Sequence, residues 1–214
     1  FSEVWVGGRL GSEAQAAIGL AGQIWFFMVL LIVALSAGTN ALVSRFWGAG
    51  DVENAVIAAR QSMIFSVIFG VTITVVGLAV SRPLLRMLGA SPQVEALGWE
   101  MLRFDLLGQP LICIHWVSNA IFRARGNTRT PMITAGVVCL LVILFNFAFC
   151  VWPFQVGIAG LGMSWPLASI VGVVMTIYLQ KKSDIGRFLD WKGPGISRDW
   201  FVRIMKIGIP ACVQ

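Results

Sequence analysis

Long stretches without a charged side chain divide the chain: residues 14–44, 61–81 and 130–180. Because an α-helix needs about 20 apolar residues to cross the core of a bilayer, the first two stretches each predict one membrane span. The third stretch is interrupted at Trp152-Pro153 and is long enough for two spans. The pattern therefore predicts a polytopic membrane protein built from α-helices.

Polar and glycine-rich segments set the boundaries of the predicted spans. Residues 1–7 are too few to cross a membrane, so we expect them to be the tail of a first span that the turn at 7–13 ends. From Asp199 another helix is expected to begin, but the chain stops after about 22 Å of helical rise. The complete spans between these two are predicted at residues 14–44, 55–80, 93–122, 131–152 and 157–180.

These elements suggest three parts of the chain: a transmembrane lobe at 1–180, a charged linker at 181–198, and the start of a seventh span at 199–214. Six spans, a linker and a further span that includes Gly208-Ile209-Pro210 are typical of one half of a duplicated transporter. We therefore interpret the chain as a fragment, truncated in its first and seventh spans.

Composition and charge agree with a membrane location. Hydrophobic residues make up 57% of the chain, charged residues only 12%, and the mean hydropathy is +0.83, outside the range of soluble domains. The net charge of +6 is explained by topology, so a nucleic-acid partner is not expected. Twelve cations fall in alternate loops on one side: Arg45, Arg60, Arg123, Arg125, Arg129, Lys181, Lys182, Arg187, Lys192, Arg198, Arg203 and Lys206.

The other four cations, Arg9, Arg82, Arg86 and Arg103, fall on the opposite side. The excess of Lys and Arg marks the cytoplasmic face, which places the linker 181–198 in the cytoplasm. We expect an integral, multi-pass protein of the bacterial inner membrane, with the lipid bilayer as its first partner. The four cysteines have no CxxC spacing, so neither a disulfide framework nor a metal site is indicated.

Two loops carry clear turn chemistry. Gly48-Ala49-Gly50 is expected to end one helix, and Asp51 to cap the next. Gly126-Asn127 predicts a tight turn, and Pro131 suits the first turn of a helix, where a backbone N–H has no partner. Both loops therefore have a structural explanation.

Four stretches of the sequence resemble the multidrug and toxic compound extrusion (MATE) transporters. The most specific is RARGNTRTP at residues 123–131, which resembles that family's loop between helices four and five. The resemblance implies an all-α protein of twelve spans in two six-helix lobes, of which this chain is the N-terminal lobe. It also implies an antiporter that exports amphipathic, often cationic, small molecules in exchange for protons or sodium, with no catalytic residue and no cofactor. The four stretches are residues 3–17, 38–51, 123–132 and 206–211.

Glu3 is the first candidate for cation coupling. It lies six residues before Arg9, the separation of the acidic residue, usually Asp, in the first helix of the family that this chain resembles. A charged acid is costly to bury in a membrane, so a desolvated Glu3 could exchange a proton or bind sodium. The alternative is that Glu3 lies in the hydrated headgroup zone.

Asn146 and Asp105 are the other candidates for cation coupling. The position of Asn146 resembles that of an Asn in the family's archaeal-type cation pocket, but Cys150 stands four residues later where that branch has Asp. An interhelical hydrogen bond is the structural alternative for Asn146. Asp105 is the deepest acid of its span and faces away from Arg103, which can pair with Glu100.

Three further residues are candidates for a substrate cavity. Trp165 stands where the family has Thr, and Pro166 after it predicts a kink that projects the ring, where a flat cation could stack on it. The alternative for Trp165 is that it packs against lipid or a neighbouring helix. Trp116 and Trp25 could likewise either line a cavity or pack in this way. Gln109 lies in Gly108-Gln109-Pro110, where we expect a helix break. His115, the only histidine, is expected to be hydrogen-bonded and structural.

Other functions are less well supported by the sequence. Gly48 to Asp51 fits the Gly-x-Gly-Asp pattern of intramembrane aspartyl proteases, but no Tyr-Asp pair supplies a second aspartate. A flippase of lipid-linked oligosaccharides from the same superfamily would need basic residues inside the lobe, and the long uncharged spans argue against it. A purely structural membrane subunit is favoured only if the chain is complete.

Overall fold

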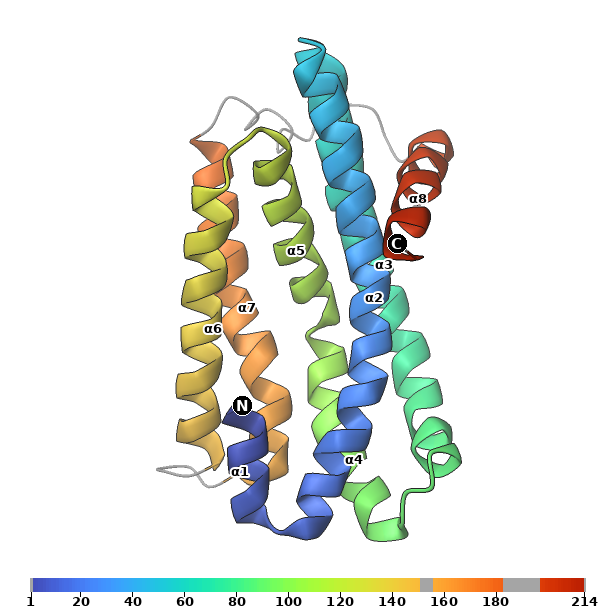
Figure 1. Ribbon diagram of the computed structural model, residues 1–214, viewed down its shortest axis with the longest axis vertical. Helices are drawn as coiled ribbons and strands as arrows, with labels where there is room; N and C mark the ends of the chain where they lie inside the picture. The colour runs from blue at the N-terminus through green and yellow to red at the C-terminus, as the bar shows by residue number, and fades with distance from the viewer. Residues whose placement is uncertain (1, 151–155, 183–196, 214) are drawn as a thin grey trace.

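The computed structural model describes residues 2–150, 156–182 and 197–213, and within those ranges it contains helices and no strand (Figure 1). The predicted all-α fold is therefore confirmed. Most of the linker predicted at 181–198 lies outside the described residues. The helices are α1 (Ser2–Leu10), α2 (Ser12–Gly48), α3 (Val52–Met87), α4 (Pro92–Leu107), α5 (Gln109–Ala124), α6 (Arg129–Cys150), α7 (Ile158–Lys181) and α8 (Arg198–Val213).

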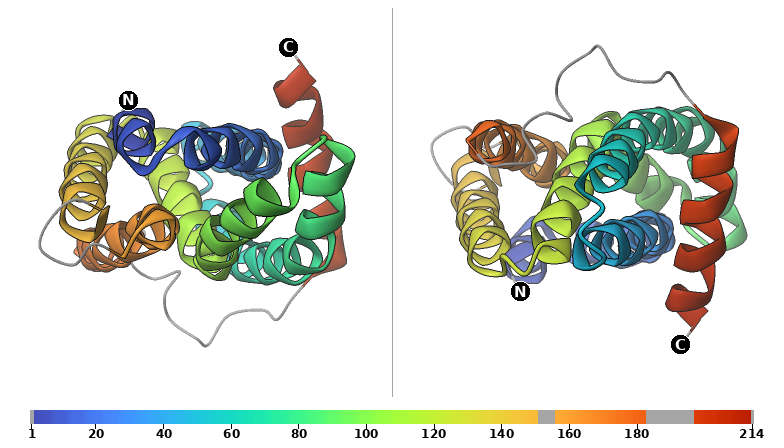
Figure 2. Two further views of the ribbon diagram at one scale, coloured as in Figure 1. Left: turned by 90° about the horizontal axis from the view of Figure 1, so that it is seen from below. Right: turned by 90° about the horizontal axis from the view of Figure 1, so that it is seen from above.

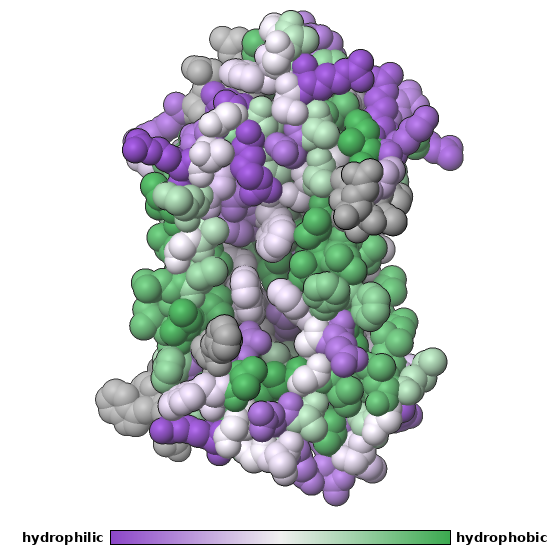
Figure 3. Space-filling view, viewed as in Figure 1, coloured by the Kyte–Doolittle hydropathy of each residue, from purple (hydrophilic) through white to green (hydrophobic). Residues whose placement is uncertain are grey.

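The long helices run side by side along the longest axis of the molecule (Figures 1 and 2). Four of the described helices, α2, α3, α6 and α7, are long and apolar enough to cross a membrane. Figure 3 shows the corresponding surface, with hydrophobic side chains in a middle band and hydrophilic side chains gathered at both ends. We refer to the end that holds the α2–α3 and α5–α6 turns as the cytoplasmic end, following the positive charge on those loops.

The span predicted at 93–122 is two helices, as the Gly108-Gln109-Pro110 sequence indicated. α4 ends at Leu107 and α5 begins at Gln109, so each has only 16 residues. A Cβ on Gly108 would overlap the ring of Pro166 on α7, and the imide nitrogen of Pro110 cannot donate to the preceding turn. The break therefore lies at a close contact between α4–α5 and α7, and it brings Asp105 and Gln109 beside the interior of the bundle.

The predicted turn chemistry is confirmed at both cytoplasmic loops. Asp51 Oδ1 accepts a hydrogen bond of 3.2 Å from the backbone N–H of Asn54 and so caps α3. Gly50 has a φ of 75° and Gly126 a φ of 79°, values at which glycine is the least strained residue. The Asn127 side chain accepts from the backbone N–H of Thr130 at 3.1 Å and so begins α6.

Two predicted boundaries were wrong. The turn expected at 7–13 is confined to Gly11, which has a φ of 109°, and α1 continues through Gly7-Gly8 to Leu10. A Cβ on Gly7 would overlap the side chain of Ile18, so Gly7 serves close packing against α2, whereas a Cβ on Gly8 would meet no atom within 4 Å. α3 continues past the expected end at 80, through Pro83 to Met87, because helices extend beyond the apolar core and carry their arginines into the interface.

Candidate functional site

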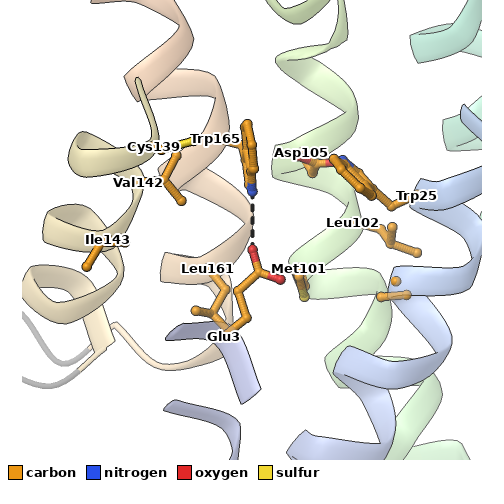
Figure 4. Close-up of a pocket in the computed structure, with 12 residues that line it drawn as sticks. Glu3, Trp25, Met101, Leu102, Asp105, Cys139, Val142, Ile143, Leu161 and Trp165 are labelled. Carbon is orange, nitrogen blue, oxygen red and sulfur yellow. Dashed lines mark hydrogen bonds between the residues drawn. The ribbon is translucent and has the colours of Figure 1, made fainter. Parts of the chain in front are cut away.

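A cavity of about 350 Å³ opens among α1, α2, α4, α6 and α7, in the half of the bundle away from the cytoplasmic end. Figure 4 shows acidic and aromatic side chains meeting there from different helices. Its wall is otherwise formed by small and aliphatic residues. The residues that line it are Glu3, Ala21, Gly22, Trp25, Met101, Leu102, Asp105, Cys139, Val142, Ile143, Leu161 and Trp165.

Glu3 is half-buried and its carboxylate points into this cavity (Figure 4). The indole Nε1–H of Trp165 donates a hydrogen bond of 3.2 Å to Glu3 Oε1. α1 is held in place by Val6, which is buried in a core cluster shared with α2, and by the rings of Trp5 and Phe147, whose centroids are 5.1 Å apart. The carboxylate is therefore directed inward by the packing of the short helix that carries it.

Asp105 is a second carboxylate on the cavity wall. The residue is 4% exposed, and Gln109 Nε2 donates a hydrogen bond of 3.3 Å to Asp105 Oδ2. Gln109 itself is buried just beyond the break between α4 and α5 and is not among the residues that line the cavity. Arg103 lies on the exposed face of α4, 3.9 Å from Glu100, so Asp105 does face away from it as predicted.

Trp25 and Trp165 contact each other beside the two carboxylates. Their ring centroids are 5.8 Å apart with an angle of 40° between the planes. Trp25 comes from α2, and Trp165 comes from α7 one residue before Pro166, a proline inside that helix. The pair gives the cavity an electron-rich aromatic surface next to two acidic groups, an arrangement suited to a flat cation.

Three candidate residues, Gln109, Asn146 and Trp116, do not line this cavity, and neither does Cys150. Asn146 is fully buried on α6, one turn beyond Val142, and is not among the lining residues. Cys150 donates from Sγ to the carbonyl oxygen of Gly157 at 3.3 Å, so the thiol makes a local contact at the end of its helix. Trp116 packs beside the core cluster of α2 to α5 and does not line the cavity.

Two features of the structure were not anticipated from the sequence. Cys139, on the cavity wall, gave no signal because it lies in an apolar run without a polar neighbour. His115 is buried, as expected of a structural histidine, and its Nε2 lies 3.1 Å from Asn119 Nδ2. Asn119 Oδ1 accepts from Thr134 Oγ1 at 2.9 Å, a link from α5 to α6 that the spacing of these residues could not reveal.

Comparisons with known proteins agree with this architecture. A family model described as MatE matches residues 1–148. The chain is 22% identical to the probable multidrug resistance protein YoeA of Bacillus subtilis, over 98% of this chain and 46% of that protein. It is 25% identical to the probable multidrug resistance protein NorM of Thermotoga maritima, over 97% of this chain and 45% of that protein.

Solved structures give the same result. The outward-facing conformation of a multidrug resistance MATE family transporter of the MOP superfamily matches with a TM-score of 0.90 and 30% identity, covering 99% of this chain and 47% of that one. The chain therefore spans about half the length of the curated relatives and solved structures that it matches. The family model covers well over half of this sequence, and the fold agrees along almost all of it, so the chain belongs to the MATE family of multidrug and toxic compound extrusion transporters.

Proposed function

We propose that this chain is the N-terminal lobe of a secondary antiporter that exports amphipathic, cationic aromatic compounds in exchange for protons or sodium. The observation that carries the proposal is the position of Glu3, an acid on a membrane helix whose carboxylate lies in a cavity of the lobe and accepts from Trp165. A carboxylate in such a place can hold either a small cation or a positively charged substrate.

The chemistry of the cavity supports a cationic aromatic substrate. Trp25 and Trp165 offer ring faces, and Glu3 and Asp105 offer negative charge. No Lys or Arg is among the lining residues, so an anionic headgroup, such as that of a lipid-linked oligosaccharide, would find no countercharge. The volume of about 350 Å³ is at the small end of the range for drug-sized ligands, consistent with a site completed by a second lobe.

Coupling would follow from competition for one carboxylate. A proton or sodium ion at Glu3 removes the negative charge that attracts the substrate, so each ligand lowers the affinity for the other. If the two ligands favour different orientations of the lobes, the ion gradient drives export by alternating access. The names of the relatives, which include multidrug export protein MepA of Staphylococcus aureus, support an exporter of this kind.

Substitution of Glu3 in the complete transporter tests the proposal. Glu3→Gln keeps an oxygen that can accept from Trp165 but removes the charge. We expect it to abolish efflux of a fluorescent cationic dye driven by an imposed proton or sodium gradient in membrane vesicles. Glu13→Gln is the matched control, because Glu13 is exposed and does not line the cavity. Undiminished efflux by the Glu3 variant, at equal expression, would overturn the proposal.

A further inference from the structure

A second cavity, of about 430 Å³, lies toward the cytoplasmic end between α2 and α8. On each helix the three lining residues are spaced i, i+3 and i+4, which places them on one face of that helix. One face of α2 therefore lies opposite one face of α8 across the cavity. The lining combines aliphatic and aromatic groups with cations. Its residues are Leu42, Arg45 and Phe46 on α2, and Arg203, Lys206 and Ile207 on α8.

The walls of this cavity are fixed by close packing on either side of it. A Cβ on Gly38 would overlap the backbone oxygen of Ile204, and a Cβ on Gly208 would overlap that of Ala34, so the two helices cross in backbone contact. Toward the start of α8, Trp200 packs on Phe46 with ring centroids 5.8 Å apart. The cavity therefore lies between two contacts of the same pair of helices.

The charge of the cavity is positive without an acid to balance it. Arg45, Arg203 and Lys206 are exposed, and no Asp or Glu is among the lining residues. Within the part of the chain that the structure describes, none of these three cations forms an ion pair. The guanidinium of Arg203 lies 5.5 Å from the ring centroid of Trp200, a contact that leaves its donors available to an anion.

We propose that this cavity binds the headgroup of an anionic phospholipid from the cytoplasmic leaflet. The three cations would hold the phosphate, and Leu42, Phe46 and Ile207 would contact the upper part of the acyl chains. Basic pockets between membrane helices on the cytoplasmic side are suited to such lipids. The apolar half of the lining favours a lipid over a free phosphate ion, which would leave that half without a partner. A bound lipid would brace α8 against α2.

The test compares phospholipids on the complete transporter purified in detergent. Dioleoylphosphatidylglycerol is added in one series and dioleoylphosphatidylcholine in another, and the melting temperature and the lipid retained in native mass spectrometry are measured. Phosphatidylglycerol is expected to bind more tightly and to raise the melting temperature more. The variant Arg45→Ala/Arg203→Ala/Lys206→Ala is expected to lose this preference, with affinity falling on the order of fivefold for each cation removed.

A matched control separates the cavity from general surface charge. Arg129→Ala/Lys181→Ala/Lys182→Ala removes the same number of exposed cations near the cytoplasmic end and is expected to keep the preference for phosphatidylglycerol. Three results would each overturn the proposal: an equal loss in the two triple variants, no preference between the two lipids in the unsubstituted protein, or equal stabilisation by inorganic phosphate alone. None of these results depends on the dye-efflux assay, so the proposed function is tested separately.

Discussion

The indole N–H of Trp165 on α7 donates a hydrogen bond of 3.2 Å to the carboxylate of Glu3 on α1, 162 positions away in the chain. The same indole ring contacts Trp25 on α2. Hydrogen bonds to an ionised acceptor are stronger than those to a neutral one, so neutralising Glu3 would loosen the hold on Trp165. The charge of one carboxylate is thereby linked to the aromatic contact between α7 and α2.

Removing the donor on Trp165 should weaken transport by a moderate factor. Trp165→Phe keeps an aromatic ring beside Trp25 but has no N–H, and loss of a hydrogen bond to a charged group costs about 1.5 kcal/mol. We expect dye efflux by the complete transporter to fall about tenfold. Trp165→Ala should reduce it further, because it also removes a ring contact that contributes about 1 kcal/mol.

The control for this pair is Trp116→Phe, since Trp116 lies outside the cavity. Its efflux rate should equal that of the unsubstituted protein. If Trp165→Phe also transported at that rate, the hydrogen bond to Glu3 would have no part in export.

Gly162 on α7 should not tolerate a side chain. A Cβ there would overlap the carbonyl oxygen of Met101 on α4, and backbone cannot move aside as a flexible side chain can. We expect Gly162→Ala to destabilise the protein by about 1–3 kcal/mol and to lower its melting temperature. Gly136→Ala on α6 meets no atom within 4 Å and should leave the melting temperature unchanged or raised. Equal melting temperatures for the two variants would contradict the close packing of α4 and α7.

The buried link between α5 and α6 should contribute to stability. Thr134→Val keeps the shape of the side chain but leaves Asn119 Oδ1 without the donor that now lies at 2.9 Å. An unsatisfied buried acceptor costs about 1–3 kcal/mol, so the melting temperature should fall. Thr72 donates only within its own helix, at an exposed position, and Thr72→Val should have no such effect. A harmless Thr134→Val would mean that Asn119 finds another donor.

The membrane helices could be predicted from the sequence because each one needs about 20 apolar, uncharged residues in a row, a pattern that can be read without knowing the tertiary packing. The break at Gly108 was also predictable, because Pro110, two residues later, has no backbone N–H to donate and its ring interrupts a helix whatever the tertiary packing. The ends of α1 and α3 could not be predicted from the sequence. Gly7-Gly8 suggested a turn, yet the space that a glycine leaves beside Ile18 is visible only once α2 is in place.

The cavity was predictable only in part, for a similar reason. Glu3 and Asp105 were conspicuous as acids on membrane helices, and both line it. Trp116 and Trp165 posed the same choice between cavity and packing, and only the packing of α7 against α1 and α2 separates them. Asn146 was conspicuous for its polarity, yet it is enclosed within the bundle, one helical turn from the cavity wall.

The central claim is that one carboxylate, Glu3, serves the coupling cation and the substrate in turn. Equilibrium binding of a fluorescent cationic dye to the purified complete transporter tests it directly, when repeated at increasing proton and increasing sodium concentrations. For the unsubstituted protein we expect one of these cations to weaken dye binding progressively, and for Glu3→Gln we expect dye affinity to be independent of both. Dye binding that remains equally sensitive to the cation in Glu3→Gln would contradict the claim.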